Sequence, residues 1–257
     1  MAATSLDKQS NLFVQSVAKS MGLLEAFAQR PGLLSLNELV DCTGLDRSAV
    51  QRMAYTLVVL GYMERGPGGR GYRLGKKCLD LSFDFLRGSP LVERASPVLI
   101  DLQKETGERV DLSLFDDLSI IYALRRQTKR QSFFSALIGR RMPTFSSSGG
   151  RAIMSYLRAD EVDDILQRSS LAPLTPKTIT DPDAIREKVA EARTDGYALA
   201  LEESLLGEIV LASAIIDRKG RPIGAIHISG SCSEWSAPDF THRFAPLAIA
   251  AARSLRG

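Results

Sequence analysis

Two helix-start signals follow one another closely near the N-terminus, and they constrain the fold more than any other feature of the chain. Ser35 with Glu38 three residues later forms a capping box, which predicts a short helix over Leu36–Thr43. Gly44 supplies a turn, and an aspartate then caps a further helix over about Asp46–Leu60. The pattern predicts two helices joined by a tight turn.

Apolar residues recur at helical spacing on both sides of this turn. A preceding helix is expected over Ser16–Ala28, and Arg30-Pro31-Gly32 ends it. After Gly61, two short strands at 62–65 and 72–74 should enclose a Gly-rich turn. Three helices followed by a hairpin describe a winged helix-turn-helix, which lays its third helix in the major groove of DNA. The apolar residues expected to face the core are Val17, Met21, Leu24 and Phe27 in the first helix and Val50, Met53, Leu57 and Leu60 in the third.

The excess positive charge of the chain lies in this N-terminal part. Residues 1–90 hold 11 Lys and Arg against 8 Asp and Glu, while residues 91–257 hold 22 of each, so the net charge of +3 belongs to the first part. Between Arg47 and Lys77, seven basic residues face one acid, Glu64. Such a local excess is typical of a surface that binds a polyanion.

The third helix and the hairpin carry the candidate DNA-binding residues. We expect the polar face of the helix to read base edges and the hairpin arginines to bind phosphates. A small three-helix unit can instead be an interaction module whose basic face is only solvated, and this alternative stays open. The candidates are Arg47, Ser48, Gln51, Arg52, Tyr55, Arg65, Arg70 and Arg73.

Two nucleotide-binding motifs in the same region fail on context. Residues 66–71 match G-x-G-x-x-G, but a strand-like segment follows where the dinucleotide fingerprint needs a helix. Residues 75–77 do not form a P-loop because Arg70 occupies the first glycine position and no Ser or Thr follows the lysine.

A linker and a second domain follow. The apolar stretch at 78–86 is broken at 88–90 and predicts a connecting helix, so we expect a DNA-binding domain at 1–77, a linker at 78–89 and a second domain at 90–257. Hairpins and helices alternate in the second domain, which predicts an antiparallel sheet flanked by helices, an α+β fold. The expected strand pairs are 110–115 with 118–124 and 209–216 with 222–229, and the expected helices are 91–106, 149–157, 159–167, 184–195 and 238–255.

The N-terminal residues closely resemble the DNA-binding half of IclR-type bacterial transcriptional regulators. The resemblance rests on Gly32–Leu39, Gly44–Arg52, Leu60–Arg65 and Tyr72–Gly75. It implies a recognition helix at about residues 46–60 and a wing at about residues 64–73. In this family the linker segment helps to pair two protomers, so we expect a homodimer, or a tetramer built from dimers, that reads the half-sites of a DNA operator.

The rest of the chain resembles the IclR effector-binding domain, which has a GAF-like fold. The resemblance as a whole covers about Val14–Arg253. It implies a transcription regulator, either a repressor or an activator, whose operator binding is modulated by a small-molecule effector. The matching residues are Gly139–Pro143, Leu174–Pro182, Asp195–Tyr197, Glu202–Glu203 and Ile226–Gly230.

A serine-rich segment before an expected helix is the candidate effector site. Hydroxyls and free backbone N–H groups at a helix start suit a carboxylate, although serines in this place can also be simple caps. In the family this segment lines the effector pocket, together with positions on two strands. The candidate effector-binding residues are therefore Ser147, Ser148, Gly149, Gly150, Val210, His227 and Ser229.

Three departures from the family favour a less polar pocket. Phe145, Val210 and Ala200 stand where many relatives carry His, Cys and a polar residue. His227 can hydrogen-bond or become charged near neutral pH. Together these residues favour an aromatic or other hydrophobic organic acid as the effector. An inward-facing core histidine is the alternative interpretation of His227.

Catalysis, metals and cofactors are not expected. The chain has two histidines and no G-x-S-x-G motif, and Cys42, Cys78 and Cys232 include no C-x-x-C pair. The N-terminus lacks a secretion signal and no apolar run reaches the ~20 residues of a membrane span, so we expect a cytoplasmic, nucleoid-associated protein without a membrane partner. The alternative function is a small-molecule sensor or protein-interaction module whose winged helix does not bind DNA.

Overall fold

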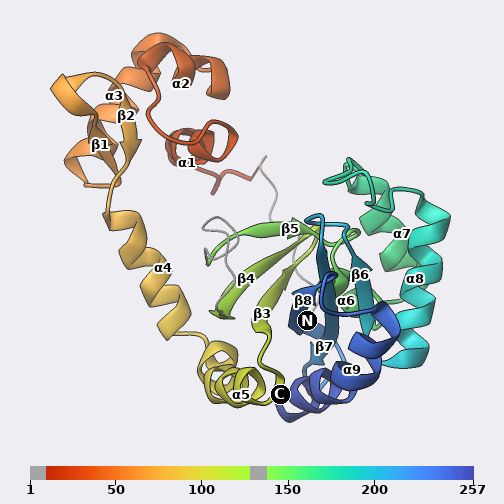
Figure 1. Cartoon of the computed structure of the whole chain (residues 1–257). Helices are drawn as coiled ribbons and strands as arrows, with labels where there is room; N and C mark the ends of the chain where they lie inside the picture. Colours follow the sequence, from red (N-terminus) through yellow and green to blue (C-terminus); the bar gives the residue numbers. More distant parts are fainter. Residues whose placement is uncertain (1–9, 128–137) are drawn as a thin grey trace. The chain divides into compact units, whose positions relative to one another are not determined.

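The computed structural model describes residues 10–127 and 138–257, and the chain divides into two compact units between Gly88 and Ser89. Figure 1 labels the helices and strands of both units. The described part of the first unit is a group of short helices followed by a hairpin and a final helix. Its elements are α1 (Gln15–Gln29), α2 (Leu36–Thr43), α3 (Arg47–Val59), β1 (Met63–Arg65), the 3-10 turn η1 (Pro67–Gly69), β2 (Tyr72–Leu74) and α4 (Lys77–Arg87).

Both predicted helix starts are confirmed at the level of single hydrogen bonds. Ser35 Oγ accepts from the backbone N–H of Glu38 at 3.2 Å, and the Glu38 carboxylate accepts from the Ser35 N–H at 2.7 Å. Asp46 Oδ1 accepts from the Ala49 N–H at 2.8 Å at the start of α3. Gly44 joins α2 to α3 with a φ of 65°, in the left-handed region that favours glycine.

The core of the first unit forms where α1, α2, α3 and the hairpin meet, and it corrects part of the predicted apolar faces. Val17 and Met21 in the first half of α1 are 60% and 47% exposed, and Leu60 after α3 is 48% exposed. The buried residues of α1 all lie in its second half, so its first turns extend past the core. The buried core residues are Leu23, Ala26, Phe27, Leu34, Leu39, Val50, Ala54, Leu57, Met63 and Tyr72.

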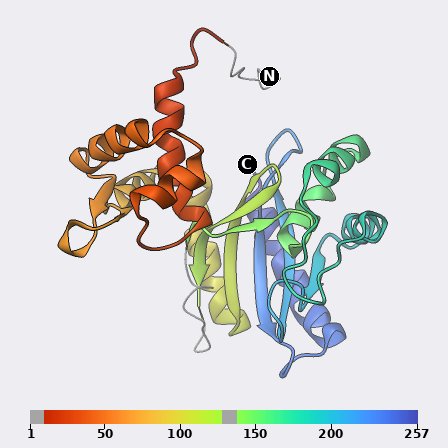
Figure 2. The ribbon, with the colours of Figure 1, turned by 90° about the horizontal axis from the view of Figure 1, so that it is seen from above.

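A six-stranded antiparallel sheet is the centre of the second unit. Its order is β5-β4-β3-β8-β7-β6, so the two predicted hairpins lie side by side, as Figure 2 shows for the green and blue strands. Both hairpins are confirmed, whereas β5 and β6, with three and four residues, were too short to leave a recognisable alternation in the sequence. The strands are β3 (Arg109–Asp116), β4 (Ser119–Arg126), β5 (Arg141–Pro143), β6 (Ala198–Leu201), β7 (Glu208–Ile216) and β8 (Pro222–Ser231).

Helices cover both faces of this sheet, as the α+β prediction required. His227 of β8 packs against Gly149 of α6, whereas Gly230 of the same strand packs against Phe240 of α9. Because odd and even positions of a strand point to opposite faces, α6 and α9 lie on opposite sides of the sheet. The helices are α5 (Pro90–Thr106), α6 (Ser148–Met154), α7 (Ala159–Arg168), α8 (Pro182–Asp195) and α9 (Ala237–Ser254).

The α6 face of the sheet differs from the α9 face because it holds buried polar residues. Asp111 and Ser113 of β3 and His227 and Ser229 of β8 are all buried. The register pairs Asp111 with His227, so these side chains lie together on one face. A polar interior of this kind needs internal partners or a ligand.

Candidate functional site

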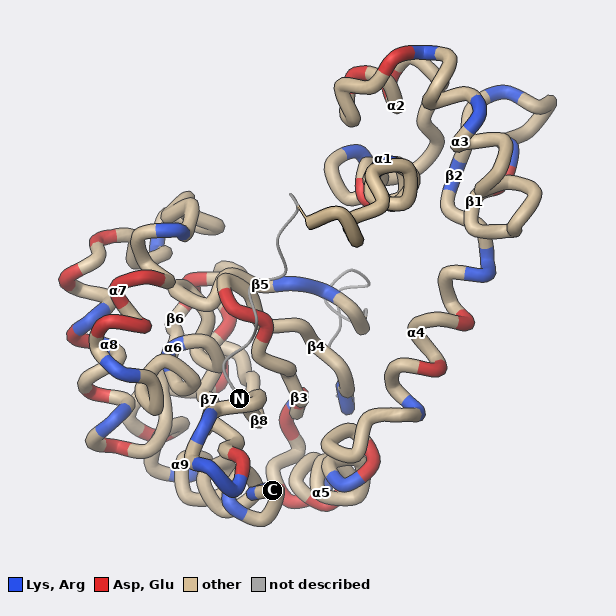
Figure 3. Tube along the Cα trace, turned by 180° about the vertical axis from the view of Figure 1, so that it is seen from behind, with Lys and Arg blue, Asp and Glu red and all other residues tan. Residues whose placement is uncertain are grey.

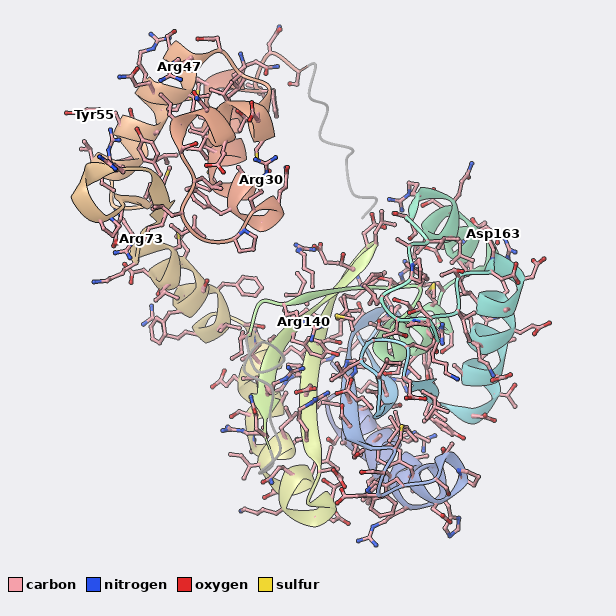
Figure 4. All side chains as sticks on the ribbon, turned by 45° about the horizontal axis from the view of Figure 1, so that its top comes forward. Arg30, Arg47, Tyr55, Arg73, Arg140 and Asp163 are labelled. Atoms are coloured by element: carbon pink, nitrogen blue, oxygen red, sulfur yellow. The ribbon has the colours of Figure 1, made fainter. Side chains whose placement is uncertain are left out.

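The predicted polar face of α3 is exposed in the structure. Arg47, Ser48, Gln51, Arg52 and Tyr55 all lie on the surface, and Tyr55 is 66% exposed. Arg47 and Ser48 have hydrogen-bond partners. The Arg47 guanidinium donates to Asn37 Oδ1, and the Ser48 hydroxyl donates to Asp46 Oδ1 at 2.7 Å. Within the described residues, the other three side chains make no hydrogen bond or ion pair. Figure 4 shows Tyr55 pointing away from the body of the unit.

The predicted wing is an exposed, basic hairpin. Arg65, Arg70 and Arg73 are exposed, and Figure 3 marks basic residues along α3 and the β1–β2 hairpin. Arg73 forms an ion pair with Glu64 at 2.8 Å, and this hydrogen bond lowers the pKa of the Glu64 carboxyl. The Arg65 guanidinium lies 4.2 Å from the centre of the Tyr72 ring. Among the residues that the structure describes, the Arg70 side chain at the hairpin tip has no hydrogen-bond or ion-pair partner.

These two elements form one candidate polyanion surface. An α-helix with free amide, guanidinium and phenol groups can reach base edges in a major groove. A neighbouring hairpin with arginines can neutralise phosphates. The local chemistry therefore suits double-stranded DNA, and the roles of the single residues stay predictions.

A cavity of about 270 Å³ opens on the α6 face of the sheet in the second unit. This is just below the range of roughly 300–1,000 Å³ that is usual for small-molecule sites, so it suits a small ligand. Three of the predicted effector residues, Ser147, Ser148 and Val210, line it. Its other lining residues are Arg109, Tyr122, Arg125, Arg140, Met142, Ala200, Ser204, Leu205 and Glu208.

The remaining predicted effector residues are buried beside the cavity and do not line it. A Cβ atom on Gly149 would lie 2.3 Å from His227 Cε1, and a Cβ atom on Gly150 would lie 2.0 Å from the carbonyl oxygen of Thr144. Both positions therefore need glycine for close packing. Ser229 is buried on β8, and its hydroxyl has no hydrogen-bond partner among the described residues. A ligand role for these residues stays a prediction.

His227 corrects one expectation of the sequence. The imidazole is fully buried, and burial lowers its pKa to about 4, so the predicted charging near neutral pH is wrong. Its Nε2 lies 2.8 Å from the Ser113 hydroxyl. In the described part of the chain, Nδ1 has no partner. His227 is thus a neutral, inward-facing histidine under physiological conditions.

The cavity is also more polar than the departures from the family suggested. Val210 and Ala200 line it with apolar groups as expected, but Phe145 lies in the core cluster with Met154 and does not line it. Charged residues on β3, β4 and β7 and Arg140 before β5 supply the polarity. These residues could not be found from the sequence, because single charges in apolar strand patterns do not show which face of the sheet is hollow.

The helix predicted as a linker presents apolar groups to solvent. Leu79, Leu81, Phe83 and Phe85 of α4 are 55–70% exposed, and none of the residues of α4 is buried. Exposed apolar side chains along a helix usually mark an interface. This arrangement supports the expectation of a paired helix, which stays a prediction.

Residues 10–127 and 138–257 contain no group of three His, Cys, Asp or Glu side chains suited to a metal ion. They also contain no helix that is long and apolar enough to cross a membrane.

Two family models match the chain and together span most of it. The IclR helix-turn-helix domain matches residues 16–67, and the bacterial transcriptional regulator IclR C-terminal domain matches residues 83–256. Both units of the structure therefore have a counterpart in one family.

Individual relatives agree with these models. The chain is 30% identical over 244 residues to the transcriptional repressor IclR of Escherichia coli K12, covering 94% of this chain and 89% of that protein. A transcriptional regulator from Rhodococcus sp. RHA1 has the same fold with a TM-score of 0.79 and 28% identity, covering 94% and 96% of the two chains. An IclR homolog from Microbacterium hydrocarbonoxydans, solved in complex with 4-hydroxybenzoate, has a TM-score of 0.76 at 23% identity, covering 94% and 97%.

Proposed function

The chain belongs to the IclR family of bacterial transcriptional regulators, and we propose that it is a homodimeric regulator whose affinity for a DNA operator is set by a small organic acid. The family consists of DNA-binding regulators with an effector domain and is not enzymatic. The single observation that carries the proposal is the exposed side chains of Gln51, Arg52 and Tyr55, which have no hydrogen-bond or ion-pair partner among the described residues and lie on the helix beside a basic hairpin.

Helix α3 and the β1–β2 hairpin of the first unit have different roles in DNA binding. Ser48, Gln51, Arg52 and Tyr55 read base edges, because they project from the exposed face of the recognition helix. The arginines of the hairpin bind phosphates, which adds affinity for any duplex without adding sequence information. Arg47 at the start of the helix contributes to either type of contact.

Pairing of two chains through α4 supplies the second half-site. Its exposed Leu79, Leu81, Phe83 and Phe85 would be covered in a dimer. A dimer, or a tetramer made of two dimers, would present two recognition helices to a palindromic operator in the cytoplasm.

The cavity in the second unit receives the effector, which is a carboxylic acid with an aromatic acid as the leading candidate. Ser147, Ser148 and Val210 line the cavity, and a protein of the same fold was solved with 4-hydroxybenzoate. Binding of the acid shifts an equilibrium between dimer arrangements that fit the operator differently. The shift releases or strengthens DNA binding according to which arrangement the acid prefers.

The experiment that tests the proposal is a footprint of the purified protein on the intergenic DNA beside its own gene, at two salt concentrations. A protected palindromic site whose affinity falls steeply with salt is the expected result. The same footprint with and without aromatic acids then tests the effector. No protection there, together with failure of selection from random duplexes, would favour a sensor or protein-interaction module without DNA binding.

A further inference from the structure

Four charged side chains form a cluster at one end of the effector cavity. Arg109 and Asp111 belong to β3, Arg125 to β4 and Glu208 to β7. Asp111 is fully buried, and the Arg125 side chain is 3% exposed. Three of the four residues, all except Asp111, line the cavity. Charged groups are rarely buried without a role or a partner, so their pairing decides what they can do.

Both carboxylates of this cluster already have arginine partners. Asp111 Oδ1 accepts from Arg125 Nε at 2.6 Å, and Asp111 Oδ2 accepts from Arg125 Nη2 at 3.0 Å and from Arg109 Nε at 3.1 Å. Arg109 Nη2 also lies 2.8 Å from Glu208 Oε1. Burial alone would lower the pKa of the Arg109 guanidinium, but attraction to these two carboxylates raises it. The cluster is therefore a fixed and internally neutral network.

One N–H donor of the network lacks an acceptor among the described residues. Arg125 Nη1 is buried and has no hydrogen-bond partner among the described residues. Its guanidinium is held in place on two sides, by Asp111 and by the Tyr122 ring, whose centre lies 4.4 Å from Arg125 Cζ. A buried N–H donor that is rigidly held and unpaired is unfavourable unless something else accepts its hydrogen bond.

Two further unpaired polar atoms lie beside this donor. The register pairs Asp111 with His227 and Arg109 with Ser229, and the atoms His227 Nδ1 and Ser229 Oγ are buried without partners in the described part of the chain. The three unpaired atoms thus belong to β4 and β8, the two strands on either side of β3. His227 and Ser229 do not line the cavity, so Arg125 is the residue of this set that a ligand in the cavity can meet.

The cavity also carries one positive charge that the network does not balance. Arg140 lines the cavity and is exposed, and within residues 10–127 and 138–257 its side chain has no ion-pair partner. Among the described residues, Arg109 and Arg125 are balanced by Glu208 in the lining and by Asp111 behind it, so the cavity and the network together keep a net charge of +1 from Arg140. A ligand with a single negative charge would neutralise it.

From these observations we infer that the cavity recognises its effector as a monocarboxylate through Arg125, which is the specificity-determining residue of the site. This inference rests on the proposed function, because it assigns a chemistry to the same cavity. The carboxylate accepts from Arg125 Nη1, and Asp111 holds the guanidinium in the required orientation. A charge-assisted hydrogen bond of this kind distinguishes an acid from a neutral ligand of the same shape.

The test is binding of matched acids and amides to the full-length protein, measured by calorimetry. The probes are acetate, pyruvate, benzoate and 4-hydroxybenzoate, each beside its neutral amide, up to millimolar concentrations. We expect at least one acid to bind about tenfold to a hundredfold more tightly than its amide, since a hydrogen bond to a charged group carries a factor of this size. R125Q should remove that preference, while R125K should restore only part of it because an ammonium cannot keep the planar arrangement.

The matched control is R126Q, which removes the same charge from the next residue of β4. The Arg126 guanidinium donates to Ser96 on α5, so its side chain lies on the other face of the sheet, and acid binding should stay as in the wild type. If R125Q does not fold, D111N/R125Q removes the buried charge and its partner together and should show the same lost preference.

Three results would overturn the inference. They are equal affinity for acids and amides, wild-type acid binding by R125Q or by the double variant, and no binding of any of the four acids to the wild type. Failure of the proposed function has a different signature, because the footprint of the wild type without a ligand measures DNA binding and does not depend on the cavity.

Discussion

The two units place their candidate functional residues in opposite environments. In the N-terminal unit, the eight candidate DNA-binding residues of α3 and the hairpin are all exposed. In the C-terminal unit, the seven candidate effector residues are all buried, and only some of them reach the cavity. A DNA-binding surface needs side chains that DNA can reach from solvent, whereas an effector cavity needs groups from distant strands held in one place.

This difference explains why the two sites respond differently to physical perturbation. Exposed charges interact weakly with one another in water, so a substitution there should change binding and leave the fold intact. Buried charges have lost their hydration, so a substitution there should change the stability of the unit before it changes anything else.

The largest effect is expected from the buried ion pair between α6 and the loop after β6. Arg151 Nη1 and Nη2 lie 2.6 and 2.8 Å from the two carboxylate oxygens of Glu203, and the Arg151 side chain is fully buried. In R151M the Glu203 carboxylate stays buried, and the hydrogen bond from the Ile179 N–H is the only one that remains to it among the described residues. We expect the free energy of unfolding of the C-terminal unit to fall by about 3–5 kcal/mol, measured by urea denaturation.

The control for R151M is an exposed pair of the same chemistry in the other unit. Arg73 and Glu64 form an ion pair with side chains that are 56% and 31% exposed. R73M should leave the unfolding transition of the N-terminal unit unchanged within error. Equal losses for R151M and R73M would contradict the contrast between the two units.

A second large effect is expected from the pH dependence of the buried His227. Its pKa is about 4 in the folded protein and about 6.5 when unfolded, so the unfolded chain binds more protons between these values. The free energy of unfolding should therefore rise with pH through this window and stay level above it. The total change attributed to His227 is about 3 kcal/mol.

Comparison with H227Q isolates this contribution from other titrating groups. Asp111, Arg125 and Arg109 are the charged groups that act on the imidazole, and they stay in place in the variant. We expect the difference between the two stability curves of the C-terminal unit to change between pH 4 and pH 6.5. A constant difference across that range would show that His227 is not protonated on unfolding in the way that its burial implies.

A smaller effect is expected on DNA recognition. R52A should weaken binding to the operator by about 1–3 kcal/mol and leave binding to random duplexes nearly unchanged, because a base contact is lost. R70A should weaken binding to both kinds of DNA alike and reduce the slope of log affinity against log salt by about 1. Gel-shift titrations at several salt concentrations measure both quantities. Equal losses on operator and random DNA for both variants would contradict this division of roles.

The same contrast explains how much of the fold could be predicted from the sequence. The start of α2 depends on Ser35 and Glu38, and the start of α3 depends on Asp46, all within one helical turn of the groups that they bind. Such local hydrogen bonds are visible in the sequence. The exposure of Val17 and Met21 could not be predicted from the sequence, because it depends on how far α1 extends past its neighbours.

The candidate sites follow the same rule. The exposed face of α3 follows from helical periodicity alone, so Arg52 and Tyr55 could be placed correctly on the surface. The cavity brings together Arg125, which Asp111 holds from the paired strand, and Val210, which lies on a strand far along the chain. Periodicity does not define such long-range neighbours. The family resemblance supplied the positions of Ser148 and Val210, and it did not point to Arg109 or Arg125.

The smallest effect is expected from a helix cap in the N-terminal unit. S35A removes the hydroxyl that accepts from the Glu38 N–H at 3.2 Å, and loss of such a cap lowers stability by about 1 kcal/mol. For a unit of this size, the midpoint of thermal unfolding should fall by about 4–8 °C. S20A is the matched control, because the Ser20 hydroxyl donates to the Ser16 carbonyl within α1 and is not a cap. Equal losses in both variants would argue against the cap.

Ser147 is a helix-capping serine in the C-terminal unit that can be compared with Ser35. Its hydroxyl accepts from the Gly150 N–H at 3.1 Å, so it caps α6 as Ser35 caps α2, but it is buried and also lines the cavity. S147A should therefore lower the stability of its own unit by a similar ~1 kcal/mol and, in addition, weaken the binding of the acid that the wild type prefers. A stability loss with unchanged acid affinity would make Ser147 a cap and nothing more. Burial beside a cavity would then not be enough to give a capping serine a second role.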